Sequence, residues 1–205
     1  MAVTWVAEGE LPSALDDQLA IVKADTLLPL AQVEALIPHE FLYSDPASRW
    51  TRGFVGGTQH ISIQTGLYPN AFRDRDHFYA FVNNVAASVG PLSDLMVDEA
   101  VAWPLQRQQG CSCVVLKLQR SRDAQRLRDL IRANVSGFDR FGAEATFHVT
   151  VAYIKDPDDR VTSSLIRQLN TLFQGARVPA GRARPDDNGF QYYNSYKTIR
   201  DWITT

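Results

Sequence analysis

The chain has 205 residues, of which 45% are hydrophobic and 21% charged, and its formal net charge is −2. This composition allows a sizeable core in one large domain or two packed lobes, and it argues against a disordered chain. The small net charge argues against a broad basic face for long duplex nucleic acid, although a small anion can still bind locally. Residues 1–10 do not resemble a signal peptide, and no apolar run approaches the roughly 18 residues that span a membrane. We therefore expect a cytoplasmic protein without a membrane partner.

The two cysteines, Cys111 and Cys113, are two residues apart and would project from the same side of a strand. Cysteines in this arrangement suit neither an ordinary disulfide framework nor a zinc site, which needs about four ligands. We therefore expect both to be free thiols in a reducing cytoplasm.

The first half of the chain alternates between strand and helix patterns. The predicted elements are a strand over 18–23, a helix over 30–37, a long connection over 38–57, a strand over 58–67 and a helix over 75–89. Pro29 stands where the first helix would begin, and Pro38 ends it. The connection over 38–57 has a length that is typical of a functional loop, unless it hides a strand.

The second half repeats this plan. The predicted elements are strands over 95–103 and 111–118 joined by a turn, a helix over 121–135, a strand over 146–155 and a helix over 158–174. Ser121 is placed to cap the first of these helices. We expect one α+β domain over residues 1–205, with pseudo-symmetric lobes over about 15–92 and 93–175 that can exchange elements. The pattern of the tail over 176–205 predicts no particular secondary structure.

Two short motifs fall at corresponding places in the two halves. They are His60-Ile61-Ser62-Ile63 and His148-Val149-Thr150-Val151, each in a β-branched strand that precedes a helix. On a strand, the histidine and the hydroxyl residue point to the same face, about 7 Å apart along the chain.

Spacing alone leaves two interpretations of these motifs open. In one, two partly buried strand histidines are satisfied by their hydroxyl neighbours. In the other, the histidines act on a phosphodiester, which needs a base for the attacking hydroxyl and an acid for the leaving oxygen. The hydroxyls of Ser62 and Thr150 would then hold the non-bridging oxygens, and pairs on two opposed strands would surround one phosphate.

The two motifs resemble the paired His-x-Thr/Ser-x signature of the 2H phosphoesterase superfamily, which includes 2′-5′ RNA ligases and RNA 2′,3′-cyclic phosphodiesterases. The resemblance covers about residues 15–175 and favours the catalytic interpretation. It implies a bilobal α+β fold around a central cleft, with His60 and His148 catalytic and Ser62 and Thr150 binding phosphate. The sequence departs from the pattern at Phe147, where many relatives have proline, and at Ser62, where threonine is commoner.

The residues that follow each motif carry a further resemblance. Gly66-Leu67 and Ala152-Tyr153 are similar to the corresponding residues of phage-encoded members. Those members include enzymes that destroy the cyclic oligonucleotide signals of bacterial anti-phage systems, such as CBASS. This similarity implies a cyclic oligonucleotide substrate, and a host cytoplasm as the location of a phage-encoded protein.

Several aromatic residues are candidates for contacts with a nucleobase. Trp5, Tyr192 and Tyr193 could stack on a base, a contact worth about 1–3 kcal/mol, and ordinary packing explains them equally well. Tyr153 is five positions after His148, so on a regular strand it faces away from the histidine, and we expect it to pack in the core.

We therefore predict a phosphodiesterase that needs neither metal nor cofactor and acts on a nucleotide or a short or cyclic oligonucleotide. The linkage cleaved is open among cyclic oligonucleotides, 2′,3′-cyclic phosphates and 2′-5′ linkages. The acid and base roles of the two histidines stay unassigned at this stage. The alternatives are a nucleotide-binding or sequestering module on the same fold and a structural protein, for example of a virion.

Overall fold

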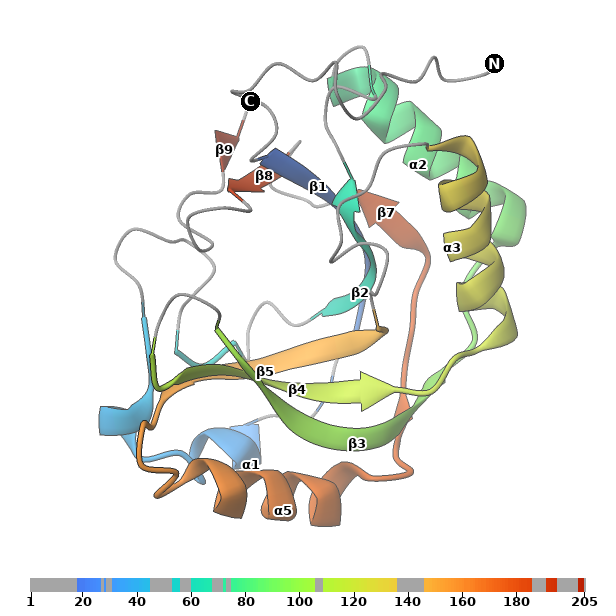
Figure 1. Ribbon diagram of the computed structural model, residues 1–205. Helices are drawn as coiled ribbons and strands as arrows, with labels where there is room; N and C mark the ends of the chain where they lie inside the picture. Colours follow the sequence, from blue (N-terminus) through green and yellow to red (C-terminus); the bar gives the residue numbers. More distant parts are fainter. Residues whose placement is uncertain are drawn as a thin grey trace.

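The computed structural model describes residues 18–26, 28, 31–44, 53–55, 60–67, 72, 75–105, 109–135, 146–185, 191–194 and 203–204 (Figure 1). The strands are β1 Gln18–Asp25, β2 His60–Leu67, β3 Leu95–Pro104, β4 Cys111–Leu118, β5 His148–Lys155, β6 Arg177–Val178, β7 Ala183–Pro185, β8 Gln191–Asn194 and β9 Ile203–Thr204. The helices are α1 Ala31–Glu34, the 3-10 turn His39–Phe41, α2 Arg75–Val89, α3 Arg122–Asn134 and α5 Thr162–Phe173.

The strands form a sheet in the order β6-β3-β4-β5-β2-β1-β8-β9, and β7 also pairs with β1. Every strand pairing among the described residues is antiparallel. Helices and antiparallel strands mix along the chain, so the predicted α+β class is confirmed. None of the helices in the described ranges is long and apolar enough to cross a membrane.

The helices cover one face of this curved sheet. Figure 1 shows α2 and α3 beside each other next to β7 and β2, and α5 running along β3. The buried alternation of the motif strands agrees, because Ile61 and Val149 are fully buried whereas His148 and Thr150 are partly exposed. We call the opposite face, which carries His60, Ser62, His148 and Thr150, the inner face.

The two motif strands are direct neighbours. β2 pairs with β5, and Ser62 is the register partner of His148. This differs from the expectation of two opposed strands, because a period-two pattern shows which residues share a face and not which strands pair. The motif residues therefore meet across one strand junction.

Most predicted elements agree with the structure to within a few residues. Ser121 caps α3 as predicted, since its Oγ accepts a hydrogen bond from the Ala124 N–H at 3.2 Å. The last helix begins at Thr162 rather than at 158, because the Asp156 carboxylate accepts hydrogen bonds from the backbone N–H groups of Val161 and Thr162, both at 2.8 Å. The first helix is shorter than predicted and covers only Ala31–Glu34.

The long connection over 38–57 contains the missed strand-like pairing. Phe54 forms a bridge with Ala152, and Leu42 with Ile154. The Tyr153 N–H donates to the Gly53 carbonyl at 2.7 Å. Beyond its short pairing with β2, the edge of β5 is therefore completed by this connection, which borders the inner face.

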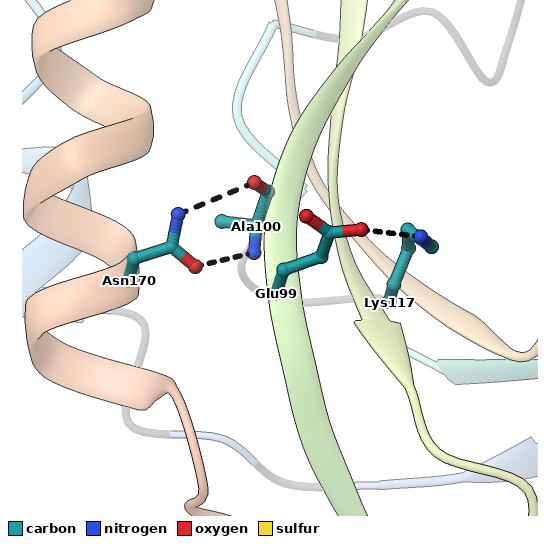
Figure 2. Close-up of polar contacts among 4 residues, drawn as sticks. All are labelled: Glu99, Ala100, Lys117 and Asn170. Atoms are coloured by element: carbon teal, nitrogen blue, oxygen red, sulfur yellow. Dashed lines mark hydrogen bonds and ion pairs between the residues drawn. The ribbon is translucent and has the colours of Figure 1, made fainter.

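A side chain takes the place of a strand at the edge of β3 (Figure 2). Asn170 on α5 accepts a hydrogen bond from the Ala100 N–H at 2.7 Å and donates one to the Ala100 carbonyl at 3.4 Å. β6 pairs with β3 only at Leu95 and Met96, so these groups of Ala100 have no strand partner on that side. Asn170 satisfies them and fastens α5 to the sheet.

The tail, for which no structure was predicted, joins the sheet. β6 extends the edge at β3, while β7 and β8 both pair with β1. Both cysteines are free, as expected, with Cys111 buried and Cys113 partly exposed.

Candidate functional site

The strand register gathers the four motif residues into one compact group. Ser62 lies opposite His148. His60 and Thr150 are each two residues further along their strands, so they lie on the same face. The two histidines are close enough that a charge on His60 lowers the pKa of His148. The predicted residues are thus brought together on one face, with His148 directly across from Ser62.

His148 is held in one orientation by its surroundings. Its Nδ1 lies 2.7 Å from the Thr146 carbonyl oxygen, which can only accept, so Nδ1 carries the proton and Nε2 has the lone pair. The Trp103 ring packs edge-to-face against the imidazole, with 4.8 Å between ring centroids. The ring therefore presents Nε2 as its basic atom.

Burial lowers the pKa of His148 from 6.5 to about 4. The positive charges of His60 and Arg128 lower this pKa further, while the hydrogen bond to Thr146 opposes the shift. Although part of the side chain reaches the surface, protein atoms pack densely around the ring, so desolvation dominates. His148 is consequently neutral at pH 7 and able to accept a proton.

A buried arginine connects the two motif strands from behind. Arg128 on α3 is only 2% exposed, and its Nε donates to the Ile63 carbonyl at 2.8 Å. Ile63 is an extra residue in the β1–β2 register, so its carbonyl is available to α3. The same guanidinium lies 3.6 Å from the centre of the Phe147 ring, directly before His148. Phe147, the departure from the 2H pattern, therefore forms part of this support.

A bulge in β5 changes the position of Tyr153. Val114 pairs with Ala152 and Val115 with Thr150, which leaves Val151 as an extra residue. Tyr153 therefore pairs with Cys113 and shares the inner face with Thr150, so the expectation that it faces away from His148 was wrong. A regular period of two cannot anticipate a bulge, which has no strong signal in the sequence.

The Cys113 thiol lies between Thr150 and Tyr153. Its Sγ is 4.0 Å from Thr150 Oγ1, a distance that allows a weak hydrogen bond. Burial raises the pKa of Cys113 to about 12, so the thiol stays protonated and acts as a weak donor. The Thr150 hydroxyl and the thiol therefore lie beside each other on the inner face.

The side chains of the candidates for base stacking fall outside the description. Trp5 lies outside the described residues. Tyr192 and Tyr193 belong to β8, which is separated from β2 by β1, and their side chains lie outside the description. Sequence reasoning missed Trp103, Lys117 and Arg128, although Lys117 is a conspicuous charge in the otherwise uncharged strand Cys111–Leu118.

Among the residues that the structure describes, no three histidine, cysteine, aspartate or glutamate side chains gather as a potential metal site. Comparison of the chain with models of known protein families and with curated proteins finds no match. The functional interpretation therefore depends on the geometry of the site.

Proposed function

We propose that this protein is a metal-independent phosphodiesterase that cleaves a nucleotide or a short or cyclic oligonucleotide. The observation that carries the proposal is the β2–β5 register, which sets Ser62 opposite His148 and brings His60 and Thr150 alongside. Two imidazoles and two hydroxyl donors then share one small area of the inner face, where the imidazoles can serve as base and acid. These are the groups that cleavage of a phosphodiester requires.

The environment of His148 supports a distinct role for this histidine. His148 is neutral at pH 7 with its lone pair on Nε2, so we assign it as the general base. It takes the proton of the attacking water or 2′-hydroxyl while that oxygen forms a bond to phosphorus. His60, in its protonated form, is the general acid and gives its proton to the leaving oxygen as the second P–O bond breaks. The charge of His60 also attracts the phosphate.

The hydroxyl groups support charge development on the phosphate. Thr150 and Ser62 each carry an O–H that can donate, and Ser62 stands directly across the strand junction from His148. Donors aimed at the non-bridging oxygens stabilise a transition state whose negative charge exceeds that of the ground state.

We further propose a bilobal 2H-type arrangement in which the β2–β5 junction separates the lobes. β2 and β5 share two register pairs, compared with seven between β4 and β5 and five between β1 and β2. So short a junction fits a boundary between two sheet parts that enclose a cleft. A cytoplasmic location fits the two free thiols.

A substrate panel tests the proposed reaction. The protein is incubated with a 2′,3′-cyclic mononucleotide, a 2′-5′-linked dinucleotide, a cyclic dinucleotide and a cyclic phosphate of a nucleotide sugar, and products are separated by chromatography. We expect turnover of at least one compound, unchanged by a chelator, and none by the His60→Ala/His148→Ala double variant. A ligand that raises the melting temperature without product would indicate a binding module, and neither effect would indicate a structural protein.

The dependence of kcat/KM on pH tests the assignment of the base. Because His148 must be neutral, its pKa of about 4 predicts a constant rate down to about pH 5 and a fall of about tenfold per pH unit below that pKa. The unfolded chain binds this proton near pH 6.5 and the folded chain only near 4, so the free energy of unfolding also falls across this window, by at most about 3 kcal/mol. Circular dichroism at each pH therefore accompanies the rates.

Arg128→Met tests the contribution of the Arg128 charge to this profile. Removing the positive charge raises the pKa of His148, so the acidic limb moves to higher pH. Arg126→Met, an exposed change on the same helix, is the matched control and leaves the limb in place. An acidic limb between pH 6 and 7 in the unaltered protein would contradict the assignment of His148 as base.

A further inference from the structure

Lys117 and Glu99 continue the line of motif residues across the sheet. Ser62 pairs with His148, His148 with Lys117, and Lys117 with Glu99, on the successive strands β2, β5, β4 and β3. Direct cross-strand partners point to the same face, so Lys117 and Glu99 stand on the inner face. Lys117 is the immediate neighbour of His148, one strand spacing or about 4.8 Å away.

The charge of Lys117 is neutralised by a partner that is easily exchanged. Its Nζ forms an ion pair with the Glu99 carboxylate, on the opposite side of β3 from Asn170 (Figure 2). The side chain of Lys117 is 29% exposed and that of Glu99 is 45% exposed. Ion pairs with this much contact with water are weak, and the carboxylate can return to solvent at little cost. Lys117 can therefore change partners when a stronger anion arrives.

We propose that Lys117 binds a second phosphate of the substrate. This inference depends on the proposed function and names its substrate class, an oligonucleotide with at least two phosphates. Lys117 lies two strand spacings from Ser62, roughly 10 Å, so it flanks the reacting phosphate without occupying its site. An ammonium group forms charge-assisted hydrogen bonds with phosphate oxygens. Glu99 competes with the ligand for this cation, and Asp98 adds a second negative charge near it.

The test compares two substrates with the same base, cyclic diadenylate with two phosphates and adenosine 2′,3′-cyclic monophosphate with one. We expect Lys117→Gln to raise KM for the first about tenfold more than KM for the second, because one charge-assisted contact is lost. Glu99→Gln removes the competing carboxylate and lowers KM for cyclic diadenylate. In Lys117→Gln the slope of log K for binding against log salt concentration should also become shallower, by the amount expected for about one phosphate contact.

A second exposed ion pair provides the control. Arg160 and Asp158 form an ion pair with 71% and 63% exposed side chains on the loop before α5, and Asp158→Asn leaves both KM values unchanged. Equal changes in the two KM values, or no change, in Lys117→Gln would overturn the inference.

A binding measurement separates failure of this inference from failure of the proposed function. Calorimetry with cyclic diadenylate is carried out in the His60→Gln/His148→Gln background, with and without Lys117→Gln. If the unaltered protein turns over neither substrate but the lysine still contributes to binding of cyclic diadenylate, the proposed reaction fails and the second-phosphate site stands. If turnover occurs and the lysine contributes nothing to binding, the inference alone fails.

Discussion

Replacing either motif histidine is expected to lower kcat by about 10²–10⁴-fold, the usual contribution of a positioned acid or base. His148→Gln removes the basic Nε2, and His60→Gln removes the proton donor, while both keep a polar side chain of similar length. The change should fall on kcat more than on KM, because proton transfer occurs in the transition state. Steady-state kinetics on the substrate identified in the panel measure the effect.

The leaving group distinguishes the two roles. A 4-nitrophenyl phosphodiester releases an anion that needs no proton, so this substrate should restore most of the activity of His60→Gln and little of the activity of His148→Gln. His39→Gln, an exposed histidine outside the motifs, is the matched control and should keep full activity. Rescue of His148→Gln instead would reverse the assignment, and full activity in either motif variant would disprove the paired-histidine reaction.

Removing a motif hydroxyl is expected to produce the next largest decrease in kcat. Thr150→Val keeps the shape of the side chain and removes the O–H that would donate to a non-bridging oxygen. Loss of one such donor costs about 10²–10³-fold in kcat, or about 2.7–4 kcal/mol of transition-state stabilisation. Ser62→Ala tests the donor on the other strand in the same way.

Conservative variants show whether the hydroxyl itself is responsible. Thr150→Ser restores the hydroxyl and should restore most of kcat, and Ser62→Thr adds only a methyl group to the donor. Ser62 is 7% exposed, so the melting temperature of each variant is measured to separate lost packing from lost catalysis. If Thr150→Val retains more than about half of the activity, the proposed role in charge stabilisation is wrong.

The support of His148 was not predictable from its motif. The Thr146 carbonyl lies only two residues before His148, whereas the Trp103 ring on β3 and the charge of Arg128 on α3 reach the imidazole only through folding. Burial of the ring is the main cause of the low pKa of His148, and the Arg128 charge adds to it, so these neighbours favour His148 as the base. A motif read alone shows two equivalent histidines.

The amino-acid sequence alone determined the local elements and the four motif residues. Apolar spacing located α2, α3 and the main strands, because buried side chains recur with a different period in a helix than in a strand. Ser121 and Asp156 are local signals for the start of a helix, because each accepts hydrogen bonds from backbone N–H groups there. The sequence alone indicated Ser121, whereas Asp156 was recognised only from its hydrogen bonds.

The tertiary structure alone decided which strands meet and in what register. The pairing of β2 with β5, the extra residues Ile63 and Val151, and the row from Ser62 to Lys117 depend on packing between distant segments. Each register step or bulge moves a side chain to the other face, so these non-local choices decide which groups share the inner face. They place Tyr153 and Lys117 beside a site that the sequence had confined to two histidines and two hydroxyls.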